Sequence, residues 1–118
     1  MNVLVAALAG AGLALAPAVV AAHSLLLEAS PAADEVLPAP PTEITLRFNN
    51  RVEKQLSTIR LVDMRGETRR VAVRADGPAD RLNAGAPALG PGQWRLEWRV
   101  LSTDGHVVTG RYSFRIAP

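Results

Sequence analysis

Apolar and polar residues alternate along most of the chain beyond residue 24, and a period of two residues is typical of β-strands rather than helices. The pattern is clearest near the carboxyl end, where Trp94, Leu96, Trp98 and Val100 alternate with charged residues. No segment sustains a helical period. We therefore expect strands within the ranges 24–28, 43–49, 57–63, 68–74, 94–100 and 112–116.

Turn signals separate these strands at short intervals. Met64-Arg65-Gly66-Glu67 has the composition of a hairpin turn in which Gly66 supplies a positive φ. The proline-rich segment 31–42 predicts an extended, solvated connector, and the polar segment 75–83 has room for one short strand. Short strands with frequent turns indicate an all-β fold, a single antiparallel β-sandwich, with Trp98 at the centre of its core.

The first 22 residues contain no Asp, Glu, Lys or Arg and resemble the apolar part of a secretory signal peptide. We expect cleavage between Ala22 and His23, which makes His23 the new amino terminus of an exported domain spanning residues 23–118. Its location is then the periplasm or the outside of the cell. An uncleaved membrane anchor is the alternative, because a spanning helix needs about 20 apolar residues and the stretch is near that length.

Composition removes several classes of function. The chain has no cysteine, so it forms no disulfide and offers no thiolate, which argues against structural zinc and soft Cu(I) sites. Its 13 Lys and Arg residues are nearly matched by 11 Asp and Glu residues, and the basic residues are spread along the expected strands without a clustered stripe. We therefore expect no nucleic-acid partner.

The two histidines supply the candidate chemistry. Once freed by cleavage, His23 offers both an amine and an imidazole nitrogen, and His106 lies two residues after Asp104. In an extended stretch, residues two apart project from the same face, with Gly105 between them leaving room. A nitrogen-rich set of this kind suits Cu(II), one ion per chain. On the residues alone, an ordinary surface histidine beside an Asp-Gly turn is an equally open interpretation.

Several motifs carry a family resemblance. The longest is the run of nine residues from Trp98 to His106, Trp-Arg-Val-Leu-Ser-Thr-Asp-Gly-His. The others are Ala22-His23-Ser24, Ala29-Ser30-Pro31-Ala32, Ile44-Thr45-Leu46-Arg47-Phe48, Gly92-Gln93-Trp94 and Gly110-Arg111-Tyr112-Ser113-Phe114. Together they resemble the CopC family of periplasmic copper-resistance proteins over the whole of residues 23–118.

The resemblance implies an immunoglobulin-like sandwich that binds Cu(II) through His23, Asp104 and His106. It also implies a CopD-type copper transport partner in the inner membrane. We expect a monomer that is not an enzyme, since the sequence shows no nucleophile–base pair for hydrolysis and binding needs only coordination. Copper sequestration, resistance and delivery all fit such a protein, and the direction of copper flow stays open.

Two departures from the family pattern narrow this expectation. Some members have a glutamate near the Cu(II) site where this chain has Asn49-Asn50, so a contribution from Asn50 stays open. Other members hold a methionine-rich loop for Cu(I), whereas Met64 is the only methionine after residue 22 and suits a core or turn position better than a ligand. We therefore expect binding of Cu(II) only.

Two other functions compete with this interpretation. An amino-terminal histidine with a second histidine on copper also resembles the histidine brace of lytic polysaccharide monooxygenases, which would make the protein a copper-dependent oxidative enzyme. A structural sandwich without metal is the other alternative.

Overall fold

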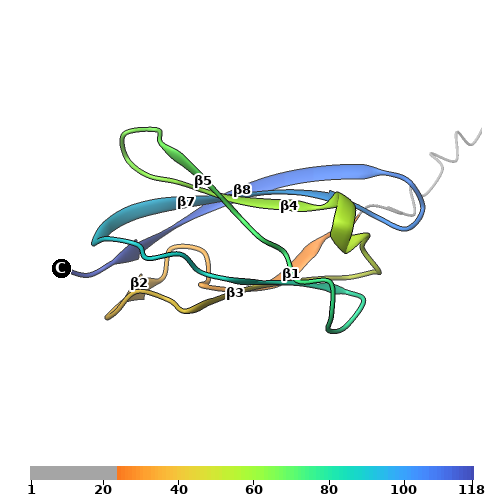
Figure 1. The fold of residues 1–118 in the computed structure, drawn as a ribbon, viewed down its shortest axis with the longest axis horizontal. Coiled ribbons are helices and arrows are strands. Elements are labelled where there is room, and N and C mark those ends of the chain that lie inside the picture. Colours follow the sequence, from red (N-terminus) through yellow and green to blue (C-terminus); the bar gives the residue numbers. More distant parts are fainter. Residues whose placement is uncertain (1–23) are drawn as a thin grey trace, which may run out of the picture.

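The alternating segments fold into two β-sheets, and the structure, a computed structural model, describes residues 24–118 (Figure 1). Within that part of the chain there are eight strands and one short 3-10 helix, η1. The strands are β1 (Leu26–Ser30), β2 (Val36–Leu37), β3 (Glu43–Phe48), β4 (Thr58–Val62), β5 (Thr68–Val71), β6 (Arg81–Gly85), β7 (Gly92–Leu101) and β8 (Val107–Ile116), and η1 spans Lys54–Leu56.

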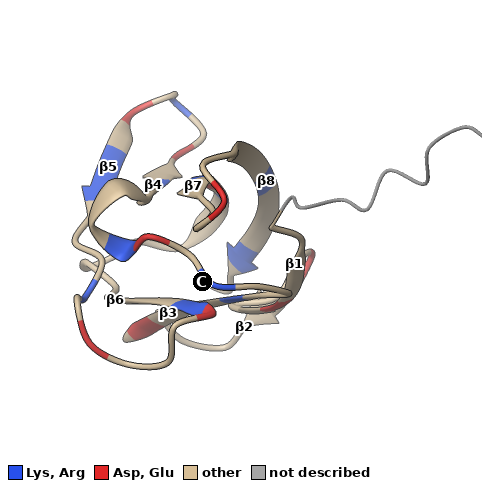
Figure 2. Ribbon diagram, turned by 90° about the vertical axis from the view of Figure 1, so that its right-hand side faces the viewer, with Lys and Arg blue, Asp and Glu red and all other residues tan. Residues whose placement is uncertain are grey.

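The two sheets lie face to face as the layers of a sandwich (Figure 2). One has the strand order β1-β3-β6, and the other has the order β2-β8-β7-β4-β5. All named strand pairs are antiparallel except β2 with β8, which run parallel. The first strand thus lies in one sheet and the second in the other, as in immunoglobulin-like sandwiches. The last two strands, β7 and β8, form an antiparallel hairpin. The predicted all-β sandwich is confirmed.

The hydrophobic core lies between the sheets and comes from the inward residues of each alternating strand. Ile44, Leu46 and Leu82 contribute from the three-stranded sheet, and Leu61 and Leu96 face them from the other; all five are fully buried. Burying one such side chain stabilises the fold by about 1.5–3 kcal/mol, so the alternation drives the pairing of the layers.

Three details differ from the sequence-based expectations. The connector 31–42 contains the two-residue strand β2. The short strand expected in 75–83 begins only at Arg81 and continues to Gly85. Trp98 is half-buried and packs at the border of the core, so its predicted central position is wrong; Trp94 is the buried tryptophan. The ring of Trp98 covers its cross-strand partner Gly110, where any side chain would collide with it.

The long hairpin β7–β8 fixes the location of the candidate site. Its strands pair residue by residue from Gly92 opposite Ile116 to Leu101 opposite Val107. The turn that joins them therefore projects at one end of the sandwich. The described chain begins at the same end, beside that turn (Figure 1).

Candidate metal centre

The turn between β7 and β8, residues 102–106, carries two of the three predicted copper ligands. The backbone N–H of Ser102 donates to the carbonyl of His106 at 2.9 Å, and that of Gly105 donates to the carbonyl of Ser102 at 2.9 Å. Gly105 has a φ of 91°, a left-handed conformation that favours glycine and completes a turn with a bulge. Asp104 and His106 thus lie on a tight turn, and the expected extended stretch is wrong.

The side chains of Asp104 and His106 nevertheless meet. Nδ1 of His106 lies 3.1 Å from Oδ2 of Asp104. The other carboxylate oxygen, Oδ1, accepts hydrogen bonds from the Ser102 hydroxyl and, at 3.1 Å, from the backbone N–H of His106. These bonds lower the pKa of Asp104 from its usual 3.8 to about 2. The bond from Ser102 has the largest effect, followed by those from the backbone and the ring of His106.

This arrangement determines which nitrogen of His106 can bind a metal. An ionised carboxylate only accepts hydrogen bonds, so Nδ1 must carry the proton that points to Asp104. In the neutral imidazole the lone pair is then on Nε2. The His106 side chain is 57% exposed, so the ring is accessible to an ion from solvent. A carboxylate on the far ring nitrogen is a common partner of metal-binding histidines.

The start of the described chain is fixed by two asparagines. Ser24 is buried, and its hydroxyl donates to Oδ1 of Asn50 at 2.5 Å. The backbone N–H of Leu25 donates to Oδ1 of Asn49 at 2.8 Å, and the backbone N–H of Asn49 donates to the carbonyl of Leu25 at 3.0 Å. The residue that follows position 23 is therefore held in one place.

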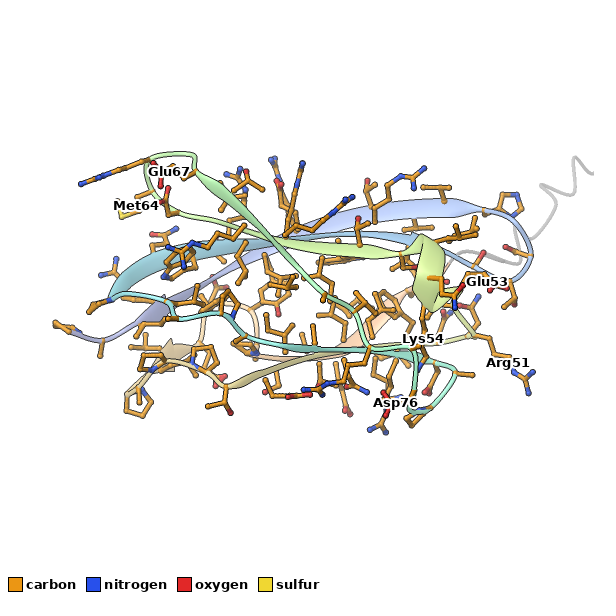
Figure 3. The ribbon with its side chains drawn as sticks, viewed as in Figure 1. Arg51, Glu53, Lys54, Met64, Glu67 and Asp76 are labelled. Carbon is orange, nitrogen blue, oxygen red and sulfur yellow. The ribbon has the colours of Figure 1, made fainter. Side chains whose placement is uncertain are left out.

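The same segment also contacts the turn. The backbone N–H of Thr103 donates to the carbonyl of Arg51 at 3.3 Å, and Val52 forms an antiparallel bridge with Ser102. Residues 49–52 thus bond on one side to Ser24 and Leu25, just before β1, and on the other to the turn that carries Asp104 and His106. Figure 3 shows Arg51 at this end of the molecule.

Two of the three predicted copper ligands are among the residues that the structure describes. Asp104 and His106 are together, whereas His23 lies outside the described residues. Within residues 24–118, no three His, Cys, Asp or Glu side chains gather as a metal-binding group. Met64 is 79% exposed in the turn between β4 and β5, at the opposite end of the sandwich (Figure 3). The turn position expected for Met64 is confirmed.

The sequence analysis did not assign a role to Ser102 or Asn49, and it left a contribution from Asn50 open. Ser102 is buried and bonds to the carboxylate that contacts His106. Serine at the first position of a turn was the only available signal. Asn50 bonds to Ser24 and Asn49 to Leu25, which are 26 and 24 positions earlier in the chain, so no local pattern predicts these bonds.

Comparison with known proteins identifies the class to which this sandwich belongs. The CopC domain model matches residues 26–117. The chain is 34% identical over 111 residues to copper resistance protein C of Xanthomonas campestris pv. juglandis, covering 86% of each. It is 31% identical over 98 residues to protein YobA of Escherichia coli K12, covering 80% of this chain and 79% of YobA.

A solved structure gives the same result. CopC from Methylosinus trichosporium OB3b superposes with a TM-score of 0.76 at 36% identity, covering 81% of this chain and 95% of that one. These matches define a copper-related β-sandwich protein rather than an enzyme. The chain belongs to the CopC family. Among the residues that the structure describes, no helix has the length and apolar character needed to cross a membrane.

Proposed function

We propose that the protein is exported, that residues 1–22 are removed, and that residues 23–118 bind one Cu(II) ion in the periplasm. The donors are the amine and ring of His23 and the Nε2 atom of His106, with Asp104 completing the centre. The observation that carries this proposal is the 3.1 Å contact between Nδ1 of His106 and Oδ2 of Asp104, on a turn that residues 49–52 connect by hydrogen bonds to Ser24 and Leu25.

Asp104 contributes to this centre through the imidazole that it contacts. Its Oδ2 atom faces Nδ1 of His106, and its Oδ1 atom is held by Ser102 and the backbone. The carboxylate is thus held in place through Oδ1 and orients the His106 ring through Oδ2. Any direct bond from Asp104 to copper is then axial at most. Partners that orient a metal-binding histidine typically change metal affinity by about 10- to 100-fold.

The donor set favours Cu(II) over Cu(I). Nitrogen and oxygen donors suit the tetragonal geometry of Cu(II), whereas Cu(I) prefers thiolate and thioether sulfur. The chain has no cysteine, and Met64 is in the turn at the other end of the sandwich. Reduction of the bound ion therefore releases it. Such a monomer can sequester Cu(II) or deliver copper to a CopD-type membrane protein.

The test compares protein that begins at His23 with protein that carries one glycine before it. The first should bind one Cu(II) per chain with a tetragonal, nitrogen-rich paramagnetic resonance spectrum. The added glycine moves the free amine off His23 and should weaken binding strongly. Protein with the same glycine added after Pro118 is the control and should bind as the unextended form. Equal affinity in all three would remove the terminal amine from the centre.

A further inference from the structure

Arginines that are spread along the sequence gather on the outer face of the five-stranded sheet. Arg70, Arg60, Glu97 and Arg111 form one row across β5, β4, β7 and β8, each directly opposite the next in the strand register. Arg99 lies two residues beyond Glu97 on the same face of β7. Long nitrogen-tipped side chains stand on this face in Figure 3, and β5 is strongly basic in Figure 2.

The positive charge of this arginine face is only partly balanced. Both carboxylate oxygens of Glu97 are already engaged, Oε1 by Nε of Arg60 at 2.6 Å and Oε2 by Nε of Arg95 at 3.1 Å. Arg111 is opposite Glu97 in the register and yet forms no ion pair with it. In residues 24–118, the guanidinium groups of Arg70, Arg99 and Arg111 form no ion pair with any carboxylate.

This arrangement works against the stability of the sheet. Arg60 and Arg70 are direct cross-strand partners, and like charges in that relation are destabilising. The inward residues of the same strands build the core, so packing places no demand for arginine on the outer side. Natural proteins keep unfavourable arrangements such as this pair of like charges mainly at functional sites, including ligand-binding sites.

The face is also hollowed. An open cavity of about 730 Å³ lies over it, lined by Arg60, Arg70, Arg99 and Arg111. The threonines Thr58, Thr68 and Thr109 add hydroxyl groups to its walls, and Glu97, Trp98 and Gly110 complete the lining. The Glu97 carboxylate is already paired with Arg60 and Arg95. The volume falls within the roughly 300–1,000 Å³ that is usual for small-molecule sites.

We propose that this cavity binds a small soluble ligand that carries two or more phosphate or carboxylate groups. Guanidinium groups bind such oxyanions through paired hydrogen bonds, and the threonine hydroxyls can donate as well. Arg70 and Arg111 lie on the first and last of four neighbouring strands, so their backbones are about 14 Å apart at the usual strand spacing. Two separate anionic groups suit this span better than one.

The test is titration calorimetry of the metal-free protein with inorganic pyrophosphate and with citrate. Orthophosphate serves as the single-group probe and should bind more weakly. The double variant Arg70→Gln/Arg111→Gln should lose at least about tenfold in affinity, since it removes two charge-assisted donors. The control Arg51→Gln/Arg65→Gln has the same net charge, lies away from the cavity, and should bind as the wild type.

Two further measurements distinguish paired hydrogen bonding from simple charge attraction and a soluble ligand from a membrane. Arg70→Lys/Arg111→Lys retains the charge but loses the paired geometry, so it should fall between the wild type and the glutamine variant. Vesicles of phosphatidylglycerol and phosphatidylcholine test the alternative source of phosphate, a membrane. Binding to vesicles alone, equal losses in both glutamine double variants, or no binding of either probe would each overturn the proposal. Copper binding should be unchanged in Arg70→Gln/Arg111→Gln, so this test is independent of the copper centre.

Discussion

Two hairpin turns at opposite ends of the five-stranded sheet share one backbone design. In the turn between β4 and β5, the N–H of Asp63 donates to the carbonyl of Glu67 at 3.0 Å, and the N–H of Gly66 donates to the carbonyl of Asp63 at 3.1 Å. The turn between β7 and β8 repeats both bonds with its own residues 102, 105 and 106. The glycines have φ values of 84° for Gly66 and 91° for Gly105.

The two turns differ in where the aspartate lies. Asp63 occupies the first position, and its Oδ1 atom accepts the backbone N–H groups of Arg65 at 2.8 Å and Glu67 at 2.9 Å. In the other turn Ser102 takes that first position and Asp104 follows two residues later, where Oδ2 meets His106. The same backbone therefore supports a purely structural carboxylate in one turn and one that orients an imidazole in the other.

The largest expected effect comes from the last position of each turn. His106→Ala removes a nitrogen donor and should weaken Cu(II) binding by more than about 100-fold, beyond the range for partners that only orient a ligand. Glu67→Ala, at the equivalent position, should leave affinity unchanged. Competition titration with a Cu(II) chelator measures both, and unfolding curves verify that each variant is folded. Comparable binding by the two variants would show that the β7–β8 turn is as structural as its counterpart.

Transferring the aspartate and the histidine to the β4–β5 turn tests whether such a turn alone is sufficient for tight Cu(II) binding. In a His106→Ala background, Arg65→Asp/Glu67→His gives the β4–β5 turn the same Asp-Gly-His sequence. That turn lies at the other end of the sandwich from the start of the described chain, so it should not regain tight Cu(II) binding. Recovery of wild-type affinity would mean that the start of the chain is not part of the centre.

A smaller effect is expected from the two aspartates. Asp104→Asn keeps the size of the side chain but removes the charge that fixes the proton on Nδ1 of His106, so Cu(II) affinity should fall by about 10- to 100-fold. Asp63→Asn should not change it. The same chelator competition measures both. A loss with Asp104→Asn greater than that with His106→Ala would reverse the two roles and make the carboxylate the principal donor.

The fold followed from the sequence because strands such as β3 and β6 bury every second residue. Leu96 and Val100 on β7 are fully buried, as the alternation predicts. The pattern failed for Trp98, although Leu96 and Val100 on the same face of β7 are fully buried, because its ring lies over Gly110 and beside Tyr112 at the border of the core. It failed for β2 because a strand of two residues, ended by Pro38, shows no period, and its pairing with β8 is set by tertiary contact.

The site was less accessible to sequence reasoning. The proximity of Asp104 and His106 was predicted, but from an extended geometry that a tight turn replaces. The bond between Ser24 and Asn50 joins residues 26 positions apart and has no local signal. The arginine face has the same origin: its members are isolated along the chain and become neighbours only through the strand register, here of Arg60 with Arg70.

The smallest expected effect tests whether the two turns share one backbone conformation. A Cβ atom at Gly66 or at Gly105 would meet nothing within 4 Å, so neither substitution to alanine causes a clash. Both glycines have left-handed φ values, which alanine adopts at a cost of about 1–2 kcal/mol. Gly66→Ala and Gly105→Ala should therefore lower the free energy of unfolding of the metal-free protein by similar amounts, as measured by urea denaturation. Asn substitutions at the same positions should be less destabilising, because asparagine tolerates this conformation better. A clear difference between the alanine variants would mean that the Asp104–His106 contact, rather than the shared backbone, determines the conformation of the β7–β8 turn.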